Sequence, residues 1–441
     1  MAAKINFIRL AELTAAQRSA LLRRSESDLP SFVEKVYPIV EAVRQEGDAA
    51  LVRFALAFDK VVLTTREIAA TPADFLAARS ALGGPLLEAI DFAADSIRRF
   101  HEKQRPPTMR MEEVRPGVYA GDMTTPIASV ACYVPRGKGA FPSSVLMTCI
   151  PARVAGVADI CIITPPGPDG RIDAATLVAA ELAGVSKVYK AGGAQGVAAV
   201  AFGTETIGKY VKVVGPGSPW VLAAKRLVAG LIDTGTPAGP SESIVFADDT
   251  TDGRLAALDL LIEAEHGEDS SAFLVTASRE IAEAALGAIP TYWNDMGPQR
   301  VAFTKAVLTS GRGGIVLARD ADEAFDFIND YAPEHLQILS KEPKHYLARV
   351  KNAGEVLLGE HTPSTLANFV VGPSHVLPTG GWARTYSALS VHDFMKRTTV
   401  AEVSRAAYAE LARHARVIAT YEGFEAHANA VSQRRDGLLG N

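Results

Sequence analysis

A regular alternation of short apolar runs and helix-length segments begins near Ile127 and constrains the fold more than any other feature of the chain. Each short run is typical of a buried strand, and each longer segment of a helix. Four such pairs occupy about 105 residues: ASVACYV with SSVLMTCIPARVAG, DICIIT with AATLVAAELAG, SKVYKAG with AQGVAAVAFG, and YVKVVG with SPWVLAAKRLVAG. Repeated β–α units predict a mainly parallel, doubly wound sheet with right-handed crossovers.

The same alternation resumes after Pro240 and predicts a second α/β unit, with segments such as SESIVFAD, DGRLAALDLLIEAEHG, SAFLVTAS and HLQILS. Apolar residues at three- and four-residue spacing predict helices through most of the first 110 residues. From about Thr398 onward the pattern is again nearly all helical. We therefore predict two Rossmann-like, mainly parallel α/β domains with helical N-terminal and C-terminal arms.

The composition argues against several classes of protein. Hydrophobic residues make up 48% and charged residues 22% of the 441 residues, which is typical of a globular chain with a large core. The net charge of −5 provides no basic surface that would favour nucleic acid. The most apolar stretch, 145–164, is interrupted by Arg153 and Asp159, so it does not favour a membrane helix. We expect no nucleic-acid or membrane partner.

Two further features favour a cytoplasmic location. The N-terminal sequence MAAKINFIRLAEL lacks the apolar core and the cleavage site of a signal peptide. The chain has three cysteines that form no CxxC pair and cannot all be bridged internally, which favours a reducing compartment. These are Cys132, Cys149 and Cys161.

Three glycine-rich segments follow predicted strands or join the two α/β units. Gly192–Gly196 and Gly215–Ser218 each lead from a strand into a helix, a geometry that lets backbone N–H groups approach a phosphate. Neither matches GxGxxG, and both can also be read as tight turns. The run 236–242 can be a linker between the units, and it would place Ser241 at the cleft between them.

Histidine and glutamate recur in patterns that suit metal binding or proton transfer. Glu263 and His266 lie at i and i+3 near a predicted helix end, so both project from one face, although a surface pair has the same spacing. Glu334 and His335 precede an apolar strand and suit a base and a water-activating acid, or simply a loop. His375 and His427 lie in loop or helix-end contexts where a structural role is also open.

Together these segments resemble the histidinol dehydrogenase family. The similar motifs run in order over roughly residues 30 to 435. They are YVP at 133–135, GGAQ at 192–195, AFGTE at 201–205, GPG at 215–217, PAGPSE at 237–242, AEHGEDS at 264–270, PEHL at 333–336, HVLPTGG at 375–381, SALSVHDFMK at 387–396 and EAHANAV at 425–431.

The resemblance implies a four-electron oxidation of a primary alcohol to a carboxylate through an aldehyde, with two NAD consumed and one zinc ion per subunit holding the substrate. It places His335 on the base that takes the alcohol proton and Glu334 on the residue that activates water. The implied NAD contacts are Tyr133, Gln195 and Ser218. The implied substrate contacts are Ser241, Glu263, His266, His335, Asn368, His375, Glu422 and His427.

The implied zinc ligands are Glu263, His266, Asn368 and His427. In the family, the residues matching His427 and Glu422 come from the partner subunit, so the resemblance also implies a homodimer with shared active sites. The corresponding domain division is an N-terminal arm (1–30), a discontinuous α/β domain with the metal and catalytic residues (31–125 and 240–380), a Rossmann-like NAD-binding domain (126–239) and a C-terminal helical dimerisation arm (381–441).

Four positions depart from the family pattern. The family usually has Gln at Glu263 and Asp at Asn368, so carboxylate and amide exchange places while the ligand charge stays at −1. Ser364 replaces an acidic residue, and Ser218 replaces an Asn. A less negative pocket disfavours a cationic substrate, because an unpaired buried charge is costly.

The combination is similar to the branch that oxidises (R)-2,3-dihydroxypropane-1-sulfonate (sulfopropanediol) to (R)-3-sulfolactate, with L-histidinol oxidation as the alternative. The candidate cations for the sulfonate include Arg136, Lys138, Arg384 and His361, and each can also be read as a solvated surface charge. Another zinc-dependent polyol or amino-alcohol dehydrogenase, and an inactive family member with a binding role, remain open from the sequence. Retention of Glu334, His335, His266 and His427 argues against an inactive protein.

Overall fold

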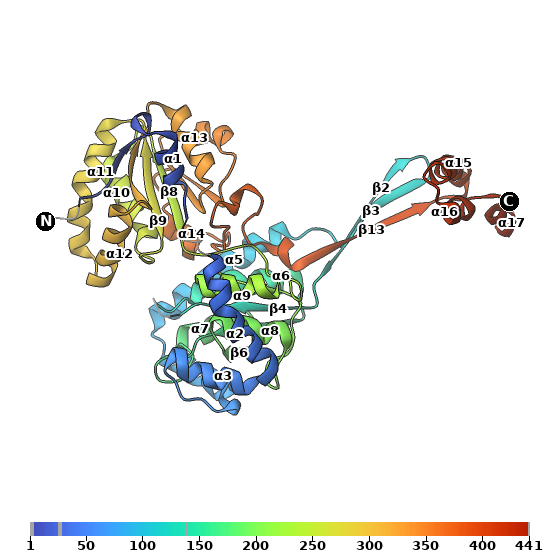
Figure 1. The fold of residues 1–441 in the computed structure, drawn as a ribbon, viewed down its shortest axis with the longest axis horizontal. Coiled ribbons are helices and arrows are strands. Elements are labelled where there is room, and N and C mark those ends of the chain that lie inside the picture. The colour runs from blue at the N-terminus through green and yellow to red at the C-terminus, as the bar shows by residue number, and fades with distance from the viewer. Residues whose placement is uncertain (1–3, 25–28, 137–138, 440–441) are drawn as a thin grey trace. The chain divides into compact units, whose positions relative to one another are not determined.

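The computed structural model describes residues 4–24, 29–136 and 139–439. The chain divides into two compact units, formed by Met1–Arg105 with Ile127–Phe394 and by Pro106–Pro126 with Met395–Asn441. In the described residues, the first unit contains a six-stranded and a four-stranded parallel sheet, and the second a three-stranded antiparallel sheet (Figure 1). The parallel sheets and their helices confirm the predicted α/β class.

The six-stranded sheet has every neighbouring pair of strands parallel. Side chains alternate between its faces, so that Val245 and Leu274 lie in one apolar cluster and Ile244 and Phe273 in another. Helices cover both faces, and α10 packs on β8 and β9. The strand order is β1 (Phe7–Arg9), β10 (Gly313–Leu317), β9 (Ser271–Thr276), β8 (Glu242–Ala247), β11 (His335–Leu339) and β12 (Glu355–Leu358). The associated helices are α1 (Ala15–Leu21), α10 (Gly253–Ala264), α11 (Arg279–Tyr292), α12 (Pro298–Thr309), α13 (Ala321–Tyr331) and α14 (Ser364–Phe369).

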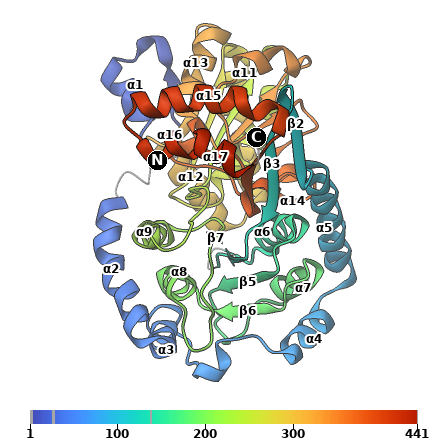
Figure 2. The same cartoon turned by 90° about the vertical axis from the view of Figure 1, so that its right-hand side faces the viewer.

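The four-stranded sheet is formed by the β–α pairs that begin near Ile127. Its strands are almost completely buried, as expected for a parallel sheet covered by helices on both faces (Figure 2). The strand order is β6 (Lys187–Lys190), β5 (Asp159–Thr164), β4 (Ser129–Tyr133) and β7 (Val213–Val214). The connecting helices are α6 (Pro142–Ala155), α7 (Ala174–Leu182), α8 (Gly193–Phe202) and α9 (Pro219–Val228).

The N-terminal helices belong to the four-stranded half of the first unit. Val36, Val40 and Val43 form the buried face of α2, which packs on α8 and α9, while α4 packs on α7 and α5 on α6 (Figure 2). The predicted grouping of 31–125 with 240–380 therefore differs from the packing: the spacing of apolar residues predicts a helix but not the sheet it will cover. Helix bounds are α2 (Leu29–Glu46), α3 (Asp48–Phe54), α4 (Pro72–Ala81) and α5 (Gly84–Gln104).

Two boundaries also differ from the predicted arms. The segment predicted as an N-terminal arm, 1–30, contributes β1, which pairs with β10 at the edge of the six-stranded sheet. The second unit begins at Met395 rather than at 381, and it includes residues 106–126. Its first C-terminal element is a strand and not the helix expected from Thr398.

The second unit is an antiparallel sheet followed by three helices. Strand β3 pairs with both β2 and β13. Most of the side chains of β2 and β13 are exposed or half-buried, so no alternation of apolar residues marks them as strands in the sequence. The elements are β2 (Met109–Arg115), β3 (Val118–Pro126), β13 (Met395–Val403), α15 (Arg405–Tyr421), α16 (Glu425–Ala430) and α17 (Gln433–Leu438).

Two sequence expectations concern membranes and cysteines. Among the described residues, no helix is both long enough and apolar enough to cross a bilayer. All three cysteines are free and buried. Burial raises the pKa of Cys149 and Cys161 well above the usual value for a thiol. The three side chains therefore act as small apolar core residues.

His101 in α5 predicts a measurable loss of stability in acid. The side chain is fully buried, and burial lowers the pKa of His101 to about 4 despite a hydrogen bond to Gln104. Because the unfolded chain binds a proton near pH 6.5, this group removes stability as the pH falls from about 6.5 to about 4, by roughly 3 kcal/mol in total. In His101→Gln we expect this part of the pH dependence to disappear. The check is the melting temperature of both proteins between pH 7 and pH 4; parallel curves for the two would contradict the assignment.

Candidate active site

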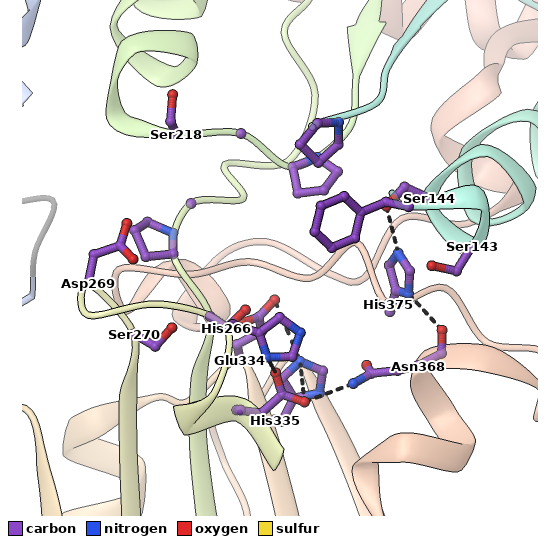
Figure 3. A pocket seen from close by; sticks show the side chains of 18 of the residues that line it. Ser143, Ser144, Ser218, His266, Asp269, Ser270, Glu334, His335, Asn368 and His375 are labelled. Atoms are coloured by element: carbon purple, nitrogen blue, oxygen red, sulfur yellow. Dashed lines mark hydrogen bonds and ion pairs between the residues drawn. The ribbon is translucent and has the colours of Figure 1, made fainter. Parts of the chain in front are cut away.

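A cavity of about 280 Å³ lies where the two parallel sheets of the first unit face each other (Figure 3). The four-stranded sheet contributes the carboxyl ends of its strands, through Pro135 after β4 and Pro216–Ser218 after β7. Strands β4 and β7 are neighbours in the sheet, although β5 and β6 lie between them in the sequence. The crevice beside the ends of two such strands is the usual ligand position in doubly wound sheets. The six-stranded sheet contributes the amino ends of its strands, through Ser241, Ser270 and Glu334–His335.

Three of the four predicted metal ligands meet at the C-terminal end of α10. The buried Glu263 is in the last turn of α10, and His266 follows that helix. The Glu263 Oε2 atom lies 3.2 Å from His266 Nδ1, and Glu263 Oε1 accepts a 2.8 Å hydrogen bond from Asn368 Nδ2. Residues 263, 266 and 368 therefore converge although 105 positions separate Glu263 from Asn368.

This cluster suits a divalent cation by its donors and by its position. Carboxylate and imidazole are ordinary zinc ligands, an amide can add a neutral oxygen donor, and the C-terminal end of a helix favours positive charge. Within the described residues, no group of three or more His, Cys, Asp or Glu side chains that could hold a metal is found. The cluster brings together one Glu and one His with an Asn, and the fourth predicted ligand, His427, belongs to the second unit.

Glu334 and His335 stand at the amino end of β11, beside this cluster (Figure 3). The His335 Nε2 atom lies 3.7 Å from Glu334 Oε1 and 3.9 Å from Glu263 Oε1. The second oxygen of Glu334 accepts a 2.9 Å hydrogen bond from the backbone N–H of Glu242. Both side chains are buried and line the cavity.

The buried charges shift the pKa of three groups in the cluster. Burial raises the pKa of Glu334 well above the usual value, although His335 opposes the shift. Burial alone would lower the pKa of His335, but Glu263, Glu334 and a hydrogen bond to Glu355 together raise the pKa to about 10. Burial would raise the pKa of Glu263, but nearby His266 and His335 and the hydrogen bond from Asn368 bring the pKa below the usual value.

His375 links the cluster to the opposite wall of the cavity. Its Nδ1 atom lies 2.8 Å from the backbone oxygen of Asn368, and its Nε2 atom lies 3.3 Å from Ser144 Oγ near the start of α6 (Figure 3). Burial lowers the pKa of His375, which favours a neutral ring. Because the carbonyl oxygen can only accept, the Nδ1 atom carries the proton and Nε2 faces Ser144. The predicted substrate residue Ser241 also lines the cavity.

The predicted nucleotide residues differ in how they meet the cavity. Ser218 is the N-cap residue of α9 and lines the wall. Tyr133 and Gln195 are buried and do not line the cavity. The Tyr133 hydroxyl accepts a 3.2 Å hydrogen bond from the backbone N–H of Gly193, and burial raises the pKa of Tyr133 to about 12. Tyr133 thus holds the glycine-rich turn before α8 in place.

The remaining predicted contacts fall outside the cavity lining, with one exception. Glu422 caps the C-terminal end of α15 and His427 lies in α16, so both belong to the second unit. Of the four cations proposed for a sulfonate, Arg136 lines the cavity, and Lys138 lies outside the described residues.

Arg384 and His361 do not line the cavity, so the structure does not support them as sulfonate contacts. The Arg384 guanidinium donates to the backbone oxygens of Gly381 and Asp330, and the His361 side chain is exposed. Sequence reasoning missed Glu355, a charged partner whose Oε1 lies 2.5 Å from His335 Nδ1, and it gave no role to Asp269, which lines the cavity. The only sequence signal for Glu355 is its place at the start of a short apolar run, EVLL, because strand register cannot be read from one chain.

Two parallel α/β halves with a cleft at the strand ends are typical of nucleotide-binding α/β proteins, and comparison with known proteins identifies the family. The family model described as Histidinol dehydrogenase matches residues 22–435. "Histidinol dehydrogenase homolog 2" of Mesorhizobium japonicum is 61% identical over 99% of both chains. Histidinol dehydrogenase of Synechocystis sp. is 46% identical over 98% of this chain and 99% of the relative. The crystal structure of histidinol dehydrogenase from Elizabethkingia anophelis has a TM-score of 0.92 at 32% identity, with all of both chains covered. The chain therefore belongs to the histidinol dehydrogenase family, a family of NAD-dependent oxidoreductases.

Proposed function

We propose that this protein oxidises (R)-2,3-dihydroxypropane-1-sulfonate to (R)-3-sulfolactate with zinc and two NAD. The reaction converts the terminal CH₂OH to a carboxylate through the aldehyde: one alcohol, two NAD⁺ and one water give one carboxylate, two NADH and three protons. The observation that carries the proposal is the hydrogen bond between Asn368 and Glu263, the two positions at which carboxylate and amide are exchanged relative to the family pattern.

In the first oxidation His335 takes the proton of the alcohol as hydride leaves for NAD⁺. Its Nε2 atom is on the side of Glu263 and Glu334, while Nδ1 is occupied by Glu355, so one ring nitrogen is available to the substrate. With a pKa of about 10, His335 holds both ring protons while only carboxylates surround it, so it would serve as a base once the charge of a bound divalent cation offsets Glu263 and Glu334. An imidazole whose pKa is brought back toward neutrality suits general-base catalysis.

In the second oxidation Glu334 draws a proton from the water that adds to the aldehyde. One carboxylate oxygen is held by the backbone N–H of Glu242, which fixes the side chain and leaves Oε1 facing His335. The raised pKa of Glu334 makes the carboxylate a stronger base than an exposed one. The hydrate then loses its second hydride to NAD⁺.

Zinc would be held by Glu263, His266, Asn368 and, from a partner subunit, His427. When bound, the ion would fix the substrate oxygens as a template and offset the negative charge that raises the pKa of His335. We also propose a homodimer in which Glu422 and His427 complete the partner's site. Exposed apolar side chains on α15 support an interface there, since Val417, Ile418 and Tyr421 are more than half exposed.

NAD would bind at the carboxyl ends of β4 and β7. Ser218 begins α9, and the first backbone N–H groups of such a helix attract phosphate. The buried Lys225 donates a 2.8 Å hydrogen bond from Nζ to the backbone oxygen of Gly215, which holds the GPG turn against this helix. A side chain at position 215 would collide with the backbone oxygen of Tyr133, and φ there is +113°, so the close approach of the two turns requires glycine.

Relative to the family pattern, α14 has one acidic residue fewer near Asn368, which supports an anionic substrate over a cationic one; the carboxylates that line the cavity are Glu263, Asp269 and Glu334. Ser364 is buried at the start of α14, where the family pattern has an acid. Arg136 brings a positive charge to the cavity wall and hydrogen-bonds the backbone oxygen of Arg171 at 3.2 Å. An ammonium group would have one carboxylate fewer near Asn368 to pair with, whereas Arg136 offers a sulfonate a cation from among the residues that line the cavity. L-Histidinol is the alternative substrate, favoured by the family model and by the name of the Synechocystis relative.

The substrate assignment predicts a clear kinetic preference. With zinc and NAD present, we expect kcat/KM for (R)-sulfopropanediol to exceed that for L-histidinol by about 10²-fold or more, because one unpaired buried charge costs about 3 kcal/mol. Each substrate molecule should yield two NADH, measured at 340 nm to completion. Faster turnover of histidinol would reject the substrate, and a yield of one NADH would reject the double oxidation.

A further inference from the structure

Glu355 stands directly behind His335 in the sheet. Strands β11 and β12 are parallel neighbours, and their register pairs residue 335 with residue 355. The side chains lie on the same face, with Glu355 Oε1 2.5 Å from His335 Nδ1. Both are largely buried, at 3% side-chain exposure for His335 and 12% for Glu355.

The backbone fixes this pairing closely. The N–H groups of Gly354 and Glu355 donate to the backbone oxygens of Pro333 and Glu334, at 2.9 and 3.0 Å. A side chain at position 354 would lie 2.6 Å from the Glu334 oxygen, so the strands approach to a distance that only glycine allows. Glu355 thus has little freedom to leave His335, and it does not itself line the cavity.

We propose that Glu355 is a positioning residue that fixes the ring and the tautomer of His335, an inference that rests on the proposed role of His335 as base. A carboxylate can only accept, so Nδ1 of His335 must carry the proton and donate it to Glu355. The ring then presents Nε2 to the cavity, on the side of Glu263 and Glu334. This is the arrangement of a base oriented by a third group.

Variants without the Glu355 carboxylate distinguish a positioning residue, whose loss lowers kcat, from an ion pair that only stabilises the fold. In Glu355→Leu the imidazole loses its acceptor, and in Glu355→Ser the only acceptor left is a hydroxyl on a side chain too short to keep the contact, so in both the ring can rotate or change tautomer. We expect kcat to fall about 10–100-fold while KM changes less than about threefold, because substrate contacts are unchanged. Glu355→Gln keeps a carbonyl oxygen that can accept from Nδ1, and its kcat should stay within about fivefold of the unmodified protein.

The matched control is Glu360→Gln, in the loop after the same strand. Glu360 is hydrogen-bonded to Thr251 and Lys341 and does not line the cavity, so kcat and KM should both be unchanged. Unchanged kcat in Glu355→Leu or Glu355→Ser would overturn the proposal. An equal loss in Glu355→Gln would show that charge, and not orientation, is what Glu355 supplies, which also overturns it.

A second measurement does not depend on turnover. In protein labelled with ¹⁵N-histidine, the short bond predicts a strongly deshielded Nδ1–H proton, assigned to His335 by its absence in His335→Ala. The signal should persist in Glu355→Gln and be lost in Glu355→Ser. Persistence in Glu355→Ser would overturn the proposal. The signal pattern holds even if sulfopropanediol proves to be the wrong substrate, so failure of the proposed function and failure of the positioning role can be distinguished.

Discussion

Replacing His335 by alanine is expected to lower kcat by about 10²–10⁴-fold while the protein keeps its zinc. The imidazole is buried and lines the cavity, and its Nε2 atom is 3.9 Å from Glu263, farther than the atoms that connect Glu263 with His266 and Asn368. Removing it takes away the proton acceptor and leaves the three predicted ligands of the first unit intact. Turnover with NAD and zinc content by elemental analysis are measured on the same preparation.

His361→Ala is the control for that experiment, because His361 is an exposed histidine that does not line the cavity. It should retain full turnover and full zinc. Loss of zinc in His335→Ala would make His335 a ligand instead of a base, and the proton transfer would then need another group. Full turnover in His335→Ala would remove the proposed mechanism altogether.

The repeated β–α pattern was sufficient to predict the two parallel sheets, because buried parallel strands are continuous apolar runs that one sequence displays directly. The predicted run DICIIT, for example, coincides with β5. The antiparallel sheet of the second unit was missed for the opposite reason. Strands β2 and β13 are mostly exposed, so their residues are free to be polar and carry no period of two. The sheet against which α2 packs could not be predicted either, because its face of buried valines would suit either parallel sheet.

The candidate site was predictable in part by spacing and in part only by resemblance. The i, i+3 spacing of Glu263 and His266 predicts side chains on one helix face; α10 ends at Ala264, so His266 lies just beyond the helix, and the two side chains still approach to 3.2 Å. That Asn368 joins them depends on how α14 returns to the end of α10, which no local pattern encodes. Glu355 depends on strand register, and in one chain nothing distinguishes it from other glutamates at strand ends.

The largest effect on metal binding is expected when Glu263 and Asn368 are returned to the Gln and Asp of the family pattern, first singly and then together. Glu263→Gln would leave two amides and His266 as the predicted ligands of the first unit, without any carboxylate. Loss of a buried charged partner costs about 2–5 kcal/mol, so the Kd for zinc should rise about 30-fold or more. The double variant Glu263→Gln with Asn368→Asp returns the carboxylate to the other side of the same contact and should restore zinc affinity to within about tenfold. Chelator competition followed by elemental analysis measures both.

The single variant Asn368→Asp completes the double-mutant cycle with Glu263→Gln and the double variant. It tests whether the residue at position 263 limits which residue position 368 can hold. Asn368 now donates to Glu263 across 2.8 Å, and an aspartate there would put two buried carboxylates against each other. Without zinc, this variant should melt at a lower temperature than the unmodified protein, because like charges at that distance cannot both stay ionised. Zinc should recover most of the loss, since a divalent cation would lie between the two groups. If the double variant binds zinc no better than Glu263→Gln, the two substitutions are independent, and the exchange of carboxylate and amide is not a coupled change at one metal site.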